Sequence, residues 1–397
     1  MPQLGGHSPR LSATRREGER VMPLELFFDL VFVLAITQCT ALMAHHPTWS
    51  GLAQGLLVLG VLWWAWVGYA WLTSVIDPEE GAVRLVMFGA MAAMLIVSLC
   101  VPDAFGDLGV VFALAYGAYR VAHIGLFMLA SPDDDALRHS VIGLAVSTAI
   151  AVSLLVLASA FDGLAQGALW ALALFSDMAG PYFFGSEGWR LVPGHFAERH
   201  GLIVIIALGE SIVAIGVGAA GALSLGIGAV AVLGVALTAA MWWIYFDVVA
   251  LVSARRLGEA EVGREQNELA RDSYSYLHFA LVAGIVLVAL GLKKAIGHYD
   301  EHLHDVPATA LFGGVALYLL GLVAFRYRHV RTINRRRLGL AIVLLILIPV
   351  ATAIPAVAAV AIVVALIWTL IAFEHRGYDE RRDQLRHEAY GASHAAP

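Results

Sequence analysis

Residues 23–38 read PLELFFDLVFVLAITQ and begin an apolar stretch that continues to about Ala44. At about 1.5 Å per residue, a helix of this length crosses the roughly 30 Å apolar layer of a bilayer. Pro23 suits the first helical position, and Glu25 lies in the first turn, where a carboxylate gains from the positive end of the helix dipole. We therefore expect a membrane-spanning helix with Glu25 as its N-terminal cap.

A second acid on this helix lies deeper in the apolar stretch. Asp29 follows Glu25 by one turn and shares its face. At that depth a carboxylate needs an ionic partner or a polar cavity. Gln38, with Thr37 and Thr40, is a candidate to line a pore with Asp29, although on an ideal helix Gln38 lies about 180° from Asp29.

The composition excludes a soluble globular protein. Of the 397 residues, 60% are hydrophobic and only 14% are charged, and the mean hydropathy is +0.77. The bilayer is thus the expected partner, and a net charge of −6 gives no reason to expect nucleic acid. Residues 1–22 are polar and precede no short apolar region with a cleavage site, so the first helix is expected to remain as an anchor.

Hydropathy predicts an all-α polytopic membrane protein with about twelve transmembrane helices. The predicted spans are 23–44, 52–76, 82–101, 107–130, 140–160, 164–184, 200–220, 224–250, 274–296, 307–327, 338–354 and 356–374.

The distribution of basic residues predicts the orientation of these spans. With a cytoplasmic N-terminus, all but Lys293 and Lys294 of the 25 Lys and Arg residues fall at or toward inner ends. That asymmetry satisfies the positive-inside rule. We expect cytoplasmic tails at 1–22 and 376–397.

The spans are also predicted to repeat. ELFFDLVFVLAIT at Glu25 aligns with ERHGLIVIIALGE at Glu198, and WWAW at Trp63 aligns with WWIY at Trp242. Six helices separate each pair, so the two halves would have the same orientation. The prediction is two parallel six-helix repeats, 23–190 and 191–375.

Two motifs carry a family resemblance. ELFFDLVFVLAITQ resembles the first helix of the bacterial low temperature requirement A (LtrA) membrane proteins, and HFAERHGLIVIIALGESIVAIG, His195 to Gly216, resembles their other marked motif. The WW pairs and YSYLH, Tyr274 to His278, fit as well, and the match runs from residue 20 to about 375. The resemblance implies a multi-pass protein of the bacterial inner membrane, associated with growth in the cold. It implies no particular molecular activity.

Glu210 is predicted to lie near the bilayer midplane, about eleven residues into its span, with Ser211 beside it. An unpaired charge there costs at least about 2.5 kcal/mol. Arg120, at similar depth and on one face with His123, is the candidate counter-charge, and Asp29 competes for it. A structural ion pair and a place in a substrate or proton path are equally open for Glu210.

Three other polar residues lie nearer the cytoplasmic ends of their spans. Asp247 follows WWIYF, whose Trp and Tyr residues are typical of interfacial anchoring. For Asp177 and His278, exposure to headgroups is the expectation.

Metal and catalytic motifs are weak. His195-x-x-Glu198-x-His200 lacks the H-E-x-x-H spacing, and a cap on the seventh helix explains it more simply. The acidic, His-containing loop at 298–305 fits a solvated loop better than a metal site. No phosphate loop, dinucleotide fingerprint or nucleophile elbow occurs in the sequence, and we predict no catalytic residue, cofactor or metal.

These observations favour a permeation or transport protein for an ion or small solute, with homo-oligomerisation open. The predicted polar path or network comprises Asp29, Arg120, Glu210, Glu25, Gln38, His123, Ser211 and Asp247. A membrane-embedded lipid-handling enzyme and a non-catalytic scaffold are the alternatives.

Overall fold

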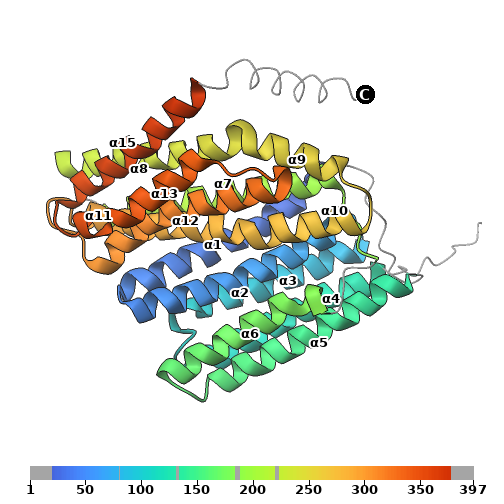
Figure 1. Ribbon diagram of the computed structural model, residues 1–397. Helices are drawn as coiled ribbons and strands as arrows, with labels where there is room; N and C mark the ends of the chain where they lie inside the picture. The colour runs from blue at the N-terminus through green and yellow to red at the C-terminus, as the bar shows by residue number, and fades with distance from the viewer. Residues whose placement is uncertain (1–19, 80, 131–133, 184–187, 220–222, 377–397) are drawn as a thin grey trace, which may run out of the picture. The chain divides into compact units, whose positions relative to one another are not determined.

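The computed structural model describes residues 20–79, 81–130, 134–183, 188–219 and 223–376 (Figure 1). In these residues the regular structure is helical, apart from one isolated bridge between His302 and Pro355. Ten of the described helical segments are long and apolar enough to cross a membrane. The expectation of an all-α multi-pass membrane protein is confirmed.

The first predicted helix forms as α1, Pro23–His45. Glu25 caps it as expected, because its carboxylate Oε2 accepts a hydrogen bond from the Met22 N–H at 2.8 Å. This bond satisfies one of the amides that every helix start leaves without an intrahelical partner.

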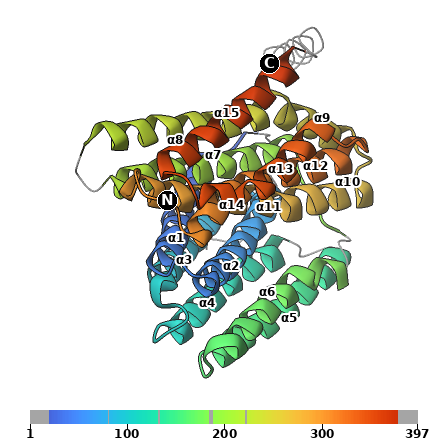
Figure 2. The same cartoon turned by 60° about the vertical axis from the view of Figure 1, so that its left-hand side comes forward.

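The chain divides into two compact units. The described residues of unit 1 fall within 20–39, 56–79, 81–130, 134–183, 188–199 and 261–268. It holds the first part of α1, most of α2 (Trp49–Thr73), and the start of α7 (Pro193–Gly218). Its other elements are α3 (Gly81–Cys100), η1 (Val101–Asp103), α4 (Gly109–Ala130), α5 (Asp135–Ala158), α6 (Gly163–Phe183) and most of α10 (Arg264–Leu269). Among them, α4 packs against α3 and α5, and α5 and α6 lie side by side in both views (Figures 1 and 2).

Unit 2 comprises residues 40–55, 200–260 and the chain from 269 onward. Beside the rest of α7, it contains α8 (Leu225–Ile244), a π-helical segment η2 (Tyr245–Val249) and α9 (Ala250–Glu259). After a second π-helical segment, η3 (Ala270–Leu277), come α11 (His278–Gly297), α12 (Asp305–Val330), α13 (Arg335–Ile346), α14 (Ile348–Ala351) and α15 (Ala356–His375).

The α11–α12 pair is the most closely packed in unit 2. A Cβ atom added at Gly284 would lie 2.6 Å from the carbonyl oxygen of Gly314, and one added at Gly314 would lie 2.8 Å from that of Gly284. Small residues that let two backbones approach are a common device of helix packing in membranes. Here they fix the contact between α11 and α12.

Two of the twelve predicted spans are not among the ten long apolar segments of the described residues. Residues 164–183 of one of these spans lie in α6, a single helix that contains Gln166, Ser176 and Asp177. The stretch 338–354 is interrupted at Leu347 and forms the two short helices α13 and α14. Pro349 explains this break, because it has no N–H to donate to the preceding turn.

The α13–α14 segment nevertheless extends over the same length as α15, in the opposite chain direction. Near residue 335, Arg337 bonds Glu374 at the end of α15. Beyond α14, the amides of Ala356 and Val357 donate to the carbonyl oxygens of Glu301 and Tyr299 at 2.8 and 3.0 Å. The segment therefore runs from one end of α15 to the other.

The charge pattern yields a topology prediction that reporter fusions can check. We expect fusions within 255–271 and 328–337 to report the cytoplasm, and fusions within 298–305 to report the opposite side, because the first two segments are rich in arginine. A reporter signal at Arg335 from outside the cytoplasm would contradict the assigned orientation.

Candidate functional site

Unit 1 contains a buried cluster of charges where α1 and α7 begin and α2 ends. His195 Nε2 lies 2.8 Å from Glu25 Oε1, and its Nδ1 lies 3.0 Å from the hydroxyl of Ser74. Asp29 receives two bonds of 3.0 Å from the guanidinium of Arg199. We call the set Glu25, Asp29, Trp66, His195 and Arg199 the end cluster.

The end cluster is almost completely saturated with hydrogen bonds. The Trp66 Nε1–H donates to Asp29 Oδ1 at 2.9 Å, and Arg199 Nη1 also donates to the carbonyl oxygen of Glu25 at 3.0 Å. The Arg199 guanidinium lies 5.6 Å from the centre of the Trp66 ring. Glu25, Asp29 and Arg199 are all buried. A bidentate pair in this setting fixes both position and orientation.

A second buried ion pair lies halfway along α4. Arg120 Nη1 is 2.7 Å from Asp177 Oδ2 on α6, and Arg120 Nη2 donates to the hydroxyl of Thr148 on α5 at 2.8 Å. That hydroxyl donates to Asp177 Oδ1 at 3.0 Å, and the Tyr116 hydroxyl donates to Asp177 Oδ2 at 2.6 Å. These four residues form the mid-span cluster, and they tie α4, α5 and α6 together.

Aromatic side chains lie between the two clusters. Tyr69 stacks on Phe28 at 4.7 Å between ring centres, and it contacts Tyr119 at 4.7 Å and His123 at 5.2 Å. Phe28 adjoins Asp29 in the sequence, and His123 follows Arg120 by one turn of α4. We call Phe28, Tyr69, Tyr119 and His123 the aromatic bridge, and the two clusters with this bridge the polar column.

The polar column contains buried polar atoms that lack a hydrogen-bond partner within the described residues. They are the Tyr69 hydroxyl, both ring nitrogens of His123, and the Nε atoms of Arg120 and Arg199. The neighbouring Tyr119 hydroxyl, by contrast, donates to the carbonyl oxygen of Ala65 at 3.1 Å. A buried polar group left without a partner costs about 1–3 kcal/mol. The unsatisfied atoms therefore mark a place where water or a solute would bind favourably.

Three of the predicted site residues belong to unit 2. Glu210 and Ser211 are buried in α7, and Asp247 is buried in the π-helical segment η2. Gln38, in unit 1, is half-buried and makes no hydrogen bond in the part of the chain that the structure describes. The polar column thus brings together Glu25, Asp29, Arg120 and His123 from the predicted set.

A histidine and tyrosine cluster in unit 2 is built from the two π-helical segments. His278 Nδ1 lies 3.1 Å from the carbonyl oxygen of Ser273, which assigns Nδ1 as a donor and leaves Nε2 to accept from the Tyr245 hydroxyl at 2.8 Å. Tyr274 stacks on the His278 ring at 5.0 Å, and His200 contacts Tyr274 at 5.1 Å. Short π-helical segments often occur at functional sites.

Several sequence expectations are corrected here. The ionic partner of Arg120 is Asp177, neither Glu210 nor Asp29, and Asp29 pairs with Arg199 instead. Asp177 and His278 are buried at 2% and 0% exposure, so the expectation of headgroup exposure was wrong. The physical reason is that both lie far enough inside the bundle to be covered by neighbouring helices.

Sequence reasoning missed Arg199 and His195 as partners of the first helix. His195 fits a helix cap, and Arg199 fits the basic charge expected at a cytoplasmic helix end. The spacing of the residues nevertheless indicates the pairing. Glu25 and Asp29 are four residues apart, and so are His195 and Arg199. Residues four apart lie on the same face of a helix, one turn from each other. Two acids on one helix can therefore pair with two basic residues on a neighbouring helix, one pair per turn.

The mid-span pair allows a stability prediction. Arg120→Met or Asp177→Asn leaves a buried partner without compensation, so each should lower the free energy of unfolding by about 3–5 kcal/mol. The combined variant Arg120→Met/Asp177→Asn should lose less than the two single losses together. Melting temperatures in detergent measure this, with Arg190→Gln, on an exposed pair 4.0 Å from Asp134, as the control. Strictly additive losses would contradict the coupling.

Comparison with known proteins bears directly on the motifs that build this column. The chain matches the family described as bacterial low temperature requirement A protein (LtrA) over residues 20–372. An uncharacterized protein of Rhizobium meliloti (strain 1021) is 29% identical over 372 residues, covering 88% of this chain and 89% of that protein. No solved structure matches the chain. Because the family match covers most of the sequence, from before α1 to near the end of α15, this protein belongs to the bacterial low temperature requirement A family.

Proposed function

We propose that this membrane protein moves an ion or a small solute across the bilayer, and that the polar column of unit 1 is part of the route. The observation that carries the proposal is the combination of two buried ion pairs with unsatisfied buried polar atoms between them. A purely structural core would be expected to satisfy such groups or to replace them by apolar side chains.

The energetics distinguish the two kinds of group in the column. The pairs Asp29–Arg199 and Arg120–Asp177 are bonded on several sides and serve as fixed charges. Tyr69, His123 and the Nε of Arg120 keep free hydrogen-bonding capacity. Buried water commonly occupies such positions, with about three hydrogen bonds each.

The chemistry of these free groups suits a proton or a small hydrogen-bonding solute. A phenol and an imidazole each donate and accept, and the adjacent guanidinium donates only. In the proposed route, the end cluster forms the entrance and the mid-span cluster holds the positive charge that selects what passes. Within unit 2, Glu210, Ser211 and Asp247 are proposed, separately from this column, as polar residues of a transport path.

The proposal includes a membrane arrangement. We propose twelve crossings in two parallel repeats, 23–190 and 191–375, in the inner membrane with both termini cytoplasmic. The helical form of α6, the path of α13–α14 alongside α15, and the arginine distribution support it. The family description supports an association with growth at low temperature.

Two alternatives make different predictions. A lipid-handling enzyme would change the lipid composition of a strain that lacks it, without moving a solute in purified form. A scaffold would do neither. Both alternatives would treat Tyr69 as a packing residue, whereas a route treats its hydroxyl as a functional group.

The Tyr69 hydroxyl gives the sharpest test. Tyr69→Phe removes an unsatisfied buried hydroxyl, so stability should stay the same or rise, while transport should fall about tenfold or more. Tyr119→Phe is the matched control, because its hydroxyl is bonded to Ala65. That variant should lose about 1 kcal/mol of stability and retain transport.

Purified protein in liposomes provides the measurement. Proton flux under an imposed membrane potential, followed with an enclosed pH-sensitive dye, is the first probe, and uptake of labelled small ions is the second. Wild-type flux above that of empty liposomes, lost in Tyr69→Phe, is the expected result. Equal flux in wild type and Tyr69→Phe would contradict the assigned route.

A further inference from the structure

A cavity of about 590 Å³ lies within unit 2, separate from the polar column. It is lined by the ends of α8, α12 and α15, the loop residues Thr332 to Asn334, the start of α13 and part of η2 and α9. Because α12 and α15 end and α13 begins there, and because the arginine-rich segment 328–337 is expected at the cytoplasmic face, we place the cavity at the membrane surface. Lipid phosphates lie at this level in a bilayer.

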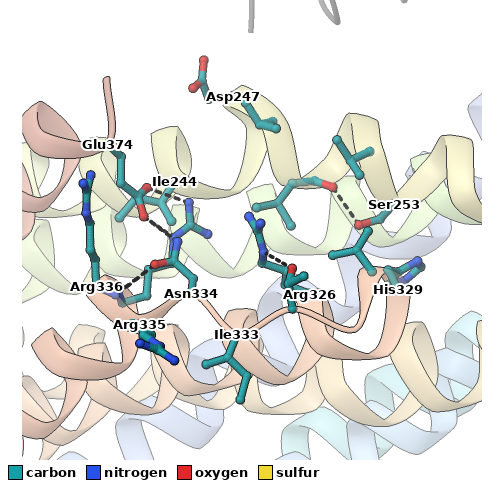
Figure 3. A pocket seen from close by; sticks show the side chains of 16 residues that line it. Ile244, Asp247, Ser253, Arg326, His329, Ile333, Asn334, Arg335, Arg336 and Glu374 are labelled. Carbon is teal, nitrogen blue, oxygen red and sulfur yellow. Dashed lines mark hydrogen bonds and ion pairs between the residues drawn. The ribbon is translucent and has the colours of Figure 1, made fainter. Parts of the chain in front are cut away.

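The cavity is basic. Four arginines line it, Arg326, Arg335, Arg336 and Arg337, against the two acids Asp247 and Glu374. Arg337 neutralises Glu374 through two bonds, of 3.0 and 2.8 Å. Figure 3 shows the Asp247 carboxylate turned away from the other labelled side chains. With four arginines against two acids, the lining carries a net positive charge.

Arg326 is the best-placed of these arginines. Figure 3 shows its side chain between Asn334 on one side and Ser253 on the other. Its Nε–H donates to the Thr332 hydroxyl at 3.1 Å, which holds the side chain without using the rest of the guanidinium. Arg335 has no hydrogen bond or ion pair within the described residues. Both can therefore bind an added anion.

The N-terminus of α13 favours an anion through its helix dipole, but two of its backbone amides are already used by the capping residue. Asn334 Oδ1 accepts from the amides of Arg336 and Arg337 at 3.1 and 3.2 Å. The helix dipole still favours a negative charge at this end. Direct contacts to a ligand must therefore come from the arginine side chains, whose planar guanidinium suits the oxygen atoms of a phosphate.

The cavity also has an apolar wall, and it is within the size range of sites for small organic ligands. The wall is formed by Ile244, Val248, Val249, Val252, Val330 and Ile333. The two ring nitrogens of His329, also on the lining, are buried without a hydrogen-bond partner in the described residues. The site thus offers basic, apolar and unsatisfied polar surface together.

We propose that this cavity binds a phosphate-bearing anion, with Arg326 and Arg335 as its principal contacts. The phosphate is supplied either by the headgroup of an anionic phospholipid or by free phosphate. The apolar wall receives the glycerol and upper chain atoms in the first case and is left empty in the second.

The test uses the purified full-length protein in nanodiscs of phosphatidylcholine. Inorganic phosphate is titrated in one arm, and the fraction of phosphatidylglycerol is raised in the other, with tryptophan fluorescence and melting temperature as readouts. Arg326→Gln should weaken the response about tenfold, since a bond between charged groups contributes about 1.5–3 kcal/mol. Arg331→Gln is the control, because Arg331 belongs to the same basic loop but not to the lining.

Each outcome bears on the proposal. A response to phosphatidylglycerol alone, lost in Arg326→Gln, assigns a lipid headgroup, and a response to inorganic phosphate, lost in the same variant, assigns free phosphate. Arg335→Gln, an exposed substitution, repeats the comparison where Arg326→Gln does not fold. Equal losses in the Arg326 and Arg331 variants would mean general surface attraction and overturn the proposal, as would the absence of any response in the wild type.

Discussion

Charge buried among apolar helices is the constraint on which unit 1 depends. Lipid chains are as apolar as leucine side chains, so hydrophobicity alone does little to choose one helix register over another. Two ion pairs supply that choice: Asp29–Arg199 ties α1 to α7, and Arg120–Asp177 ties α4 to α6. A shift of one residue along any of these helices would rotate a charge by about 100° and break its bonds. The pairs therefore define register as much as stability.

The same constraint separates structural from functional groups within the polar column. Asp177 accepts three hydrogen bonds, from Tyr116, Arg120 and Thr148, and nothing further is needed to explain its burial. Tyr69 and His123, in the same column, have hydrogen-bonding atoms that the described residues leave unsatisfied. Since one bundle contains both kinds of group, the unsatisfied atoms are not a general property of its packing. They are the part of the column that a ligand or water would complete.

The sequence predicted what local physics determines. Length and hydropathy predicted the helices, and the first-turn position of Glu25 predicted its cap. The ionic partner of a buried residue depends on which helices lie next to each other, and hydropathy carries no information about helix neighbours. For this reason the sequence predicted Glu210 as the partner of Arg120, whereas the partner is Asp177. Uncertainty of a few residues at span boundaries also changes the inferred depth by a full turn. For this reason Asp177 and His278 were expected at the surface although they are buried.

Arginine has opposite surroundings in the two units, and depth explains the difference. Arg120 lies halfway along α4 with its side chain buried, and it is compensated by a carboxylate and two hydroxyls. Arg326 and Arg335 lie at helix ends in unit 2, where solvent reduces the cost of an unpaired charge, so the fold tolerates them without a full set of acids. An arginine that the protein itself does not neutralise keeps its capacity for an external anion. The polar column and the basic cavity thus follow from one rule applied at two depths.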